Sequence, residues 1–135
     1  NLFYTKDRVV KLMDFGLAKA VEEVRKQASV IAGTPYYMPP EQAIGGIVDH
    51  RSDIYSLGVT LFQFCTGTVP FQQGDVIYHH AHTPPPDVRE RVPELPESLA
   101  LLIRQMMAKD PDARVQSAEE VAQRLREIVA ELQRA

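Results

Sequence analysis

Residues 52–66 read SDIYSLGVTLFQFCT, and this stretch decides the fold class that we expect. Ser52 and Asp53 are residue types that cap helices, so a helix is predicted to begin there. The apolar residues that follow lie on all sides of that helix, which is typical of a helix at the centre of a core. Gly67 and Pro70 are residues that end helices, so we expect this central helix to stop just before them.

The flanking segments predict further helices and one hairpin. Strand-like residues 2–5 and 9–13 surround a polar Lys6-Asp7-Arg8 turn, which indicates a short β-hairpin. Helical spacing of apolar residues, or a short helix between turn signals, occurs in three later segments: 74–82, 99–107 and 121–132. Residues 117–120, SAEE, form a capping box that opens the last helix. The expected fold is mainly α with a short N-terminal β-hairpin, in one domain covering residues 1–135.

Two segments predict loops. Residues 17–33 mix charged and apolar residues without a clear period, so we interpret them as an exposed loop. Residues 84–96 read PPPDVRERVPELP and hold five of the chain's ten prolines. Such a segment is either a ligand for a proline-recognition domain or an extended spacer between helices. We favour the spacer.

The composition excludes several classes of protein. The chain has 135 residues, of which 44% are hydrophobic and 24% are charged, as in ordinary globular domains. Its net charge of −3 argues against a nucleic-acid partner, which would favour a basic surface. No apolar run reaches the roughly 18 residues that a membrane-spanning helix needs. Cys65 is the only cysteine, so we expect no intrachain disulfide and a reducing, cytoplasmic location.

Four motifs occur in a fixed order along the chain. Asp-Phe-Gly at 14–16 follows a strand-like segment, GTPYYMPPE occupies 33–41, SDIYSLG occupies 52–58, and DPDAR occupies 110–114. Any one of these motifs alone is weak evidence for a family. Together, the four closely resemble the C-terminal lobe of a serine/threonine protein kinase of bacterial type. The resemblance runs from Asn1 to about Leu125. It implies an incomplete protein-kinase-like C-lobe, without the N-terminal lobe.

The resemblance implies that ATP and Mg²⁺ are the cofactors. Asp14 would otherwise be a costly buried carboxylate after an apolar strand, and magnesium prefers hard oxygen ligands of this kind. Asn1 resembles the asparagine that closes the family's catalytic loop and supplies a second metal ligand. Phe3 and Met13 would line the adenine pocket; packing in a hydrophobic core explains these two equally well.

The resemblance also assigns roles around the segment between the first two motifs. Phe15 would pack inward and Gly16 would allow the sharp backbone turn after Asp14. Thr34 would help to position the substrate hydroxyl, which favours serine and threonine in protein substrates. Ser29 is the one free hydroxyl for activating phosphorylation, with Lys19 as a partner for the phosphate; a solvated loop serine is the alternative. A dimer for autophosphorylation is compatible with this interpretation.

Three further residues are expected to be structural. The resemblance implies that Glu41 and Arg114, seventy-three positions apart, form a buried ion pair; arginine suits this role because its planar guanidinium meets a carboxylate at two points. Asp53 resembles the family's buried aspartate at a helix start, which anchors the backbone of the catalytic loop.

His79, His80 and His82 raise the alternative of a transition-metal site, but adjacent histidines point in different directions on a helix and no second ligand cluster accompanies them.

Several parts of the family's catalytic apparatus lie outside the sequence. The glycine-rich loop, the strand lysine and the catalytic base are missing, so we expect this chain alone to be inactive and poorly packed. The start at Asn1, without Met or signal peptide, suggests a piece of a longer protein. The alternative function is a kinase-like scaffold, or pseudokinase, that binds partners without catalysis.

Overall fold

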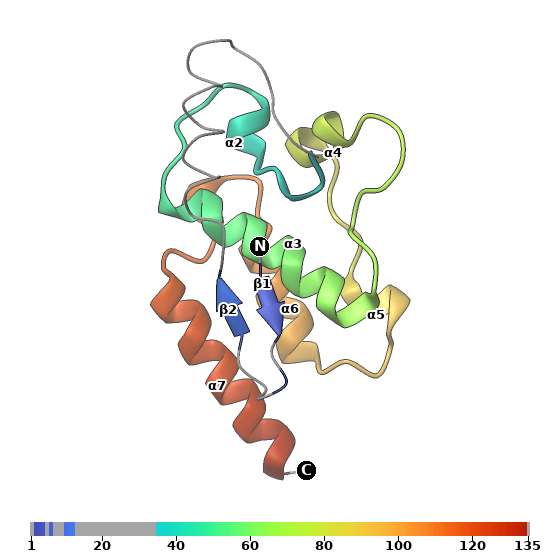
Figure 1. Ribbon diagram of the computed structural model, residues 1–135, viewed down its shortest axis with the longest axis vertical. Helices are drawn as coiled ribbons and strands as arrows, with labels where there is room; N and C mark the ends of the chain where they lie inside the picture. Colours follow the sequence, from blue (N-terminus) through green and yellow to red (C-terminus); the bar gives the residue numbers. More distant parts are fainter. Residues whose placement is uncertain (1, 5, 7–9, 13–34, 135) are drawn as a thin grey trace. The chain divides into compact units, whose positions relative to one another are not determined.

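The computed structural model describes residues 2–4, 6, 10–12 and 35–134 (Figure 1). The chain divides into two compact units. The first, here the hairpin unit, covers Asn1–Thr34, and the second, the helical unit, covers Pro35–Ala135.

The hairpin unit contains two short antiparallel strands, β1 (Leu2–Tyr4) and β2 (Val10–Leu12). Leu2 pairs with Leu12, Phe3 with Lys11 and Tyr4 with Val10 along the antiparallel ladder. Lys6 lies in the turn region and is exposed. The hairpin predicted from the sequence is therefore confirmed.

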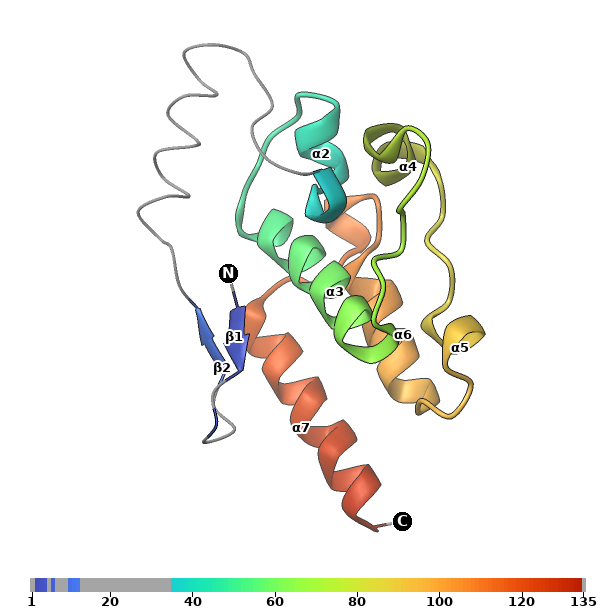
Figure 2. The same cartoon turned by 45° about the vertical axis from the view of Figure 1, so that its right-hand side comes forward.

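The helical unit is built from helices and short 3₁₀ turns. In chain order they are η1 (Pro35–Tyr37), α2 (Pro40–Ala43), α3 (His50–Thr66), α4 (Val76–His82), α5 (Val88–Arg91), α6 (Glu97–Met106), η2 (Pro111–Ala113) and α7 (Ala118–Arg134). α3 lies beside α6, and α6 also contacts α7 (Figures 1 and 2). α4 packs against α2 and η1. No helix in the described ranges is long and apolar enough to cross a membrane.

The ends of α3 show why the central helix forms where it does. Asp49 is the N-cap: its carboxylate accepts a hydrogen bond from the backbone N–H of Arg51, and Ser52 Oγ accepts one from the N–H of Asp49. The helix was predicted to begin at Ser52 and Asp53, but it begins two residues earlier, at His50, so both residues lie in its first turn. Gly67 ends the helix in the left-handed conformation, φ 79°, as expected.

The core forms on both sides of the contact between α3 and α6. Gly58 allows this contact, because a Cβ there would lie 2.9 Å from Met106 Cβ and from Met107 Cγ. One cluster of buried residues comprises Tyr55, Val59, Phe62, Val69, Val88, Ala100, Ile103 and Met107. A second comprises Ile54, Leu102, Met106, Val115, Val121 and Ile128. The predicted apolar face of α6 therefore contributes to the core. In α7 the prediction is confirmed for Val121 and Ile128, whereas Val129 and Leu132 of the same predicted face are 51% and 54% exposed.

Three local predictions need correction. Residues 84–96 are not a continuous extended spacer, because Asp87 caps the short helix α5 by accepting a hydrogen bond from Arg89 N–H at 2.8 Å. At the start of α7, Ser117 Oγ accepts from Glu120 N–H, but Glu120 accepts from the N–H of Gln116, so the reciprocal half of the capping box is displaced by one residue. The central helix also exposes one large apolar side chain, Phe64, to solvent at 59%.

Candidate functional site

The predicted site residues fall into three groups. Seven lie outside the described residues: Asn1, Met13, Asp14, Phe15, Gly16, Ser29 and Thr34. Phe3 is in β1, where its backbone pairs with Lys11. Glu41, Asp53 and Arg114 lie in the helical unit.

Glu41 and Arg114 form the buried ion pair that the sequence predicts. Arg114 Nη1 donates to Glu41 Oε2 at 2.9 Å, and Nη2 donates to Oε1 at 3.0 Å. Both side chains are buried, with 2% of Arg114 and 6% of Glu41 exposed. Ser52 Oγ donates a third hydrogen bond to Glu41 Oε2 at 2.6 Å. The pair joins α2 to the segment between η2 and α7.

Every N–H of the Arg114 guanidinium has an acceptor. Besides the two bonds to Glu41, Nε donates to the carbonyl of Ala108 at 2.9 Å, Nη1 to that of Arg51 at 2.6 Å, and Nη2 to that of Lys109 at 3.3 Å. The guanidinium also lies over the Tyr55 ring, 5.2 Å from its centroid. Lysine, with a compact ammonium, could not reproduce this set of contacts.

The electrostatics of Glu41 follow from these contacts. Burial acts to raise the pKa of Glu41, but the hydrogen bonds from Arg114 and Ser52 and the charge of Arg114 outweigh it and hold the pKa below its usual value. The carboxylate is therefore ionised at neutral pH, and its role is structural.

Asp53 does not occupy the buried position that the resemblance implies. In the structure its side chain is exposed, whereas its neighbours Ser52, Ile54 and Tyr55 are buried. Successive helical residues are rotated by about 100°, so the one residue of this turn that points away from the core is Asp53.

A second buried polar cluster was missed by sequence reasoning. His80 on α4 is fully buried; its Nδ1 lies 2.7 Å from the Tyr55 hydroxyl and its Nε2 lies 3.0 Å from the backbone carbonyl oxygen of Tyr36 in η1. Lys109 donates to the carbonyl of His79 at 3.1 Å and to the Tyr55 hydroxyl at 3.4 Å. The only sequence signal is that Val76 and His80, four residues apart, share the buried face of α4.

The direction of each hydrogen bond in this cluster can be assigned. A carbonyl oxygen only accepts, so His80 Nε2 carries the proton and donates to Tyr36. Burial and the nearby charge of Lys109 lower the pKa of His80 to about 4, so the ring is neutral and Nδ1 accepts from the Tyr55 hydroxyl. Burial and the charge of Arg114 likewise lower the pKa of Lys109 to about 8.

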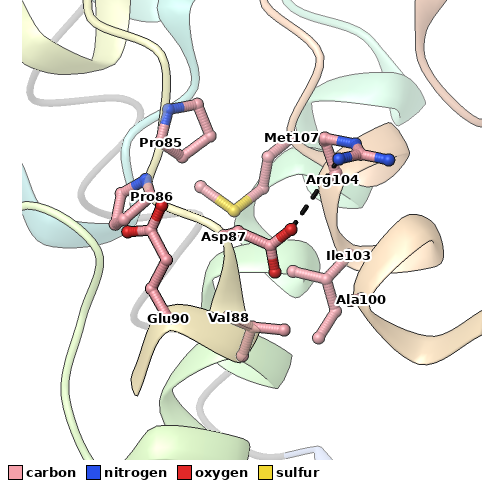
Figure 3. Close-up of a pocket in the computed structure, with 9 residues that line it drawn as sticks. All are labelled: Pro85, Pro86, Asp87, Val88, Glu90, Ala100, Ile103, Arg104 and Met107. Carbon is pink, nitrogen blue, oxygen red and sulfur yellow. Dashed lines mark ion pairs between the residues drawn. The ribbon is translucent and has the colours of Figure 1, made fainter. Parts of the chain in front are cut away.

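A pocket of about 210 Å³ lies between the segment around α5 and α6 (Figure 3). Val88, Ile103 and Met107 give it apolar walls, and Asp87 faces Arg104 at 3.8 Å across its rim. Asp87 is already engaged as the cap of α5, so its place in the pocket has a structural explanation. Among residues 35–134 and the described strand positions, no group of three or more potential metal ligands occurs.

Comparison with known proteins places these features in a family. The model of the protein kinase domain matches residues 1–125. The chain is 41% identical over 127 residues to a DNA damage-responsive serine/threonine-protein kinase of Deinococcus radiodurans, covering 90% of this chain and 19% of that protein. It is 38% identical over 128 residues to the serine/threonine-protein kinase PknB of Mycolicibacterium smegmatis, covering 90% of this chain and 20% of that protein.

A third relative is serine/threonine-protein kinase pkn3 of Myxococcus xanthus, which is 40% identical over 121 residues, covering 82% of this chain and 22% of that protein. The chain thus spans about a fifth of the length of the curated relatives it matches. The match to the family model agrees with the order of the four motifs and with the buried Glu41–Arg114 pair between the second and the fourth. The chain belongs to the protein kinase domain family.

Proposed function

We propose that the chain is the C-terminal part of a serine/threonine kinase domain that transfers the γ-phosphate of ATP to serine or threonine hydroxyls of protein substrates. The structural observation that carries the proposal is the Glu41–Arg114 pair, which fixes the end of the GTPYYMPPE motif to the helical core. Relatives named as serine/threonine-protein kinases support the same reaction and substrate class.

The proposal assigns the chemistry to residues of the N-terminal third. Asp14 and Asn1 offer a carboxylate and an amide oxygen, a donor set that fits Mg²⁺. Bound magnesium neutralises charge on the transferred phosphate. Phe3 and Met13 would contact the adenine, and Thr34 would orient the substrate hydroxyl. The catalytic base is expected upstream of this chain, and Phe15 and Gly16 would shape the backbone on either side of the metal ligand.

Regulation is assigned to the segment between the Asp-Phe-Gly and GTPYYMPPE motifs. Ser29 would accept an activating phosphate, whose negative charge Lys19 could pair with. A second copy of the protein would supply that phosphate in a transient dimer. Because the reaction consumes ATP, the proposed location is the cytoplasm.

The test compares the full-length protein with its Asp14→Asn variant. With labelled ATP and Mg²⁺, wild type is expected to phosphorylate protein, and D14N to lose at least about a hundredfold in kcat, since charge stabilisation dominates such transfers. Glu119→Gln, at an exposed position outside the four motifs, is the control and should retain wild-type activity. A D14N variant with at least half of the wild-type kcat contradicts the assigned role, and an inactive wild type supports a scaffold instead.

A further inference from the structure

We propose that His80 is a positioning residue that fixes the main chain of η1, and with it the segment that holds the protein substrate. This inference rests on the proposed kinase function, because it assigns substrate positioning to the chain that continues from Thr34. It is carried by contacts within the helical unit.

The main chain of η1 is held by side chains from two helices. His80 Nε2 on α4 donates to the carbonyl of Tyr36, and Ser56 Oγ on α3 donates to the next carbonyl, Tyr37, at 2.6 Å. The N–H of Met38 closes the turn by donating to the carbonyl of Pro35 at 3.2 Å. Consecutive carbonyls are thus fixed from different helices, which defines the orientation of this short turn.

The surroundings of His80 select one state of its ring. The titratable groups that face it are Tyr55 on α3, Lys109 before η2, and His79 on its own helix. Phe71 packs edge-on against the ring, with centroids 5.2 Å apart, and excludes water from that side. Lys109 donates to the Tyr55 hydroxyl, which donates to Nδ1, so the only remaining proton of the ring points at Tyr36.

The buried N–H of His80 needs an acceptor, and the acceptor that it meets is the main chain of η1. The Nδ1 atom accepts a hydrogen bond from the Tyr55 hydroxyl within the core. The Nε2 atom donates to the backbone carbonyl of Tyr36, 44 residues earlier in the chain. Loss of that bond leaves the core contact intact but releases one of the two side-chain anchors of η1. The expected consequence is weaker binding of the peptide substrate, with ATP binding unchanged.

Two substitutions separate positioning from stability. In His80→Gln the side-chain amide reaches about the position of Nε2 and can still donate to Tyr36, whereas in His80→Asn the shorter amide reaches only the position of Nδ1. Both remove the ring and both reduce packing. Tyr55→Phe is the matched control, because it removes the partner of Nδ1 and leaves the bond to Tyr36 in place.

The first readout is steady-state kinetics of the full-length protein. The probe is the best wild-type substrate from a degenerate peptide library with a central serine or threonine. H80N is expected to raise KM for this peptide about tenfold with little change in kcat or in KM for ATP, because one buried hydrogen bond is lost. H80Q and Y55F should stay within about threefold of wild type. Equal KM values for H80N and H80Q would overturn the proposal.

The second readout does not depend on activity. Hydrogen exchange of the Met38 amide reports opening of η1, and it should accelerate in H80N but not in H80Q or Y55F. If wild type transfers no phosphate, the proposed function fails. The exchange result then still tests whether His80 fixes η1. Identical exchange rates of the Met38 amide in H80N and H80Q would overturn the proposed role of His80.

Discussion

At the scale of single residues, Arg114 uses all five of its N–H donors, two on the buried Glu41 carboxylate and three on partly buried backbone carbonyls. Arg114→Ala leaves the Glu41 carboxylate buried without its counter-ion, so the free energy of unfolding of the full-length protein should fall by about 3–5 kcal/mol. Chemical denaturation measures this, with the exposed Arg126→Ala variant as control. An unchanged melting temperature in R114A would contradict the structural role of the pair.

His80 predicts a specific dependence of stability on pH. Its pKa is about 4 in the folded protein and near 6.5 when unfolded, so between these values the unfolded chain binds more protons. The contribution of His80 to stability is therefore complete above pH 6.5 and is lost as the pH drops toward 4, by up to about 3 kcal/mol.

The pKa of Glu41 is lowered in the folded protein, so Glu41 also contributes to stability. That contribution is lost as the pH falls through the pKa of Glu41 in the folded protein. Denaturant titrations of wild type and H80Q at several pH values isolate the histidine, because both proteins keep Glu41. The slope between pH 6.5 and 4 should be smaller in H80Q. Parallel curves for the two proteins would show that His80 does not titrate as its surroundings require.

At the scale of secondary-structure elements, the contact between α3 and α6 depends on the missing side chain at Gly58. Gly58→Ala places a methyl group 2.9 Å from atoms of Met106 and Met107, and should destabilise the protein by about 1–3 kcal/mol despite the better helix propensity of alanine. In a Met107→Ala background the same change should cost less, because the cavity accepts the methyl group. Equal losses of unfolding free energy from Gly58→Ala in the two backgrounds would show that the close approach of α3 to Met107 does not determine the effect.

The helices also show which structural features could be predicted from the sequence. The centre of α3, its end at Gly67 and the apolar face of α6 follow from local periodicity and turn chemistry, and all are present. The start of α3 was missed because Asp49 and Ser52 are both capping residues and the intervening His50 and Arg51 give no apolar signal. The short helix α5 was missed because the surrounding prolines suggested an extended chain throughout.

At the scale of the whole molecule, contacts between residues far apart in the sequence were predictable only where both residues belong to a family motif. The pairing of Glu41 with Arg114 came from the order of family motifs, and the structure contains it. The bonds of His80 to Tyr55 and Tyr36 span 25 and 44 residues, and no local pattern encodes them. Asp14, Asn1, Thr34 and Ser29 remain predictions from the sequence.

Phosphoryl transfer to serine or threonine is the central proposed activity of the protein, and phosphoamino-acid analysis tests it most directly. The full-length protein is incubated with γ-labelled ATP, Mg²⁺ and a mixed protein substrate, and the labelled protein is hydrolysed to its amino acids. We expect label on phosphoserine or phosphothreonine, and none when Mg²⁺ is chelated. Label on phosphotyrosine alone, or no label from a folded wild-type protein, would contradict it.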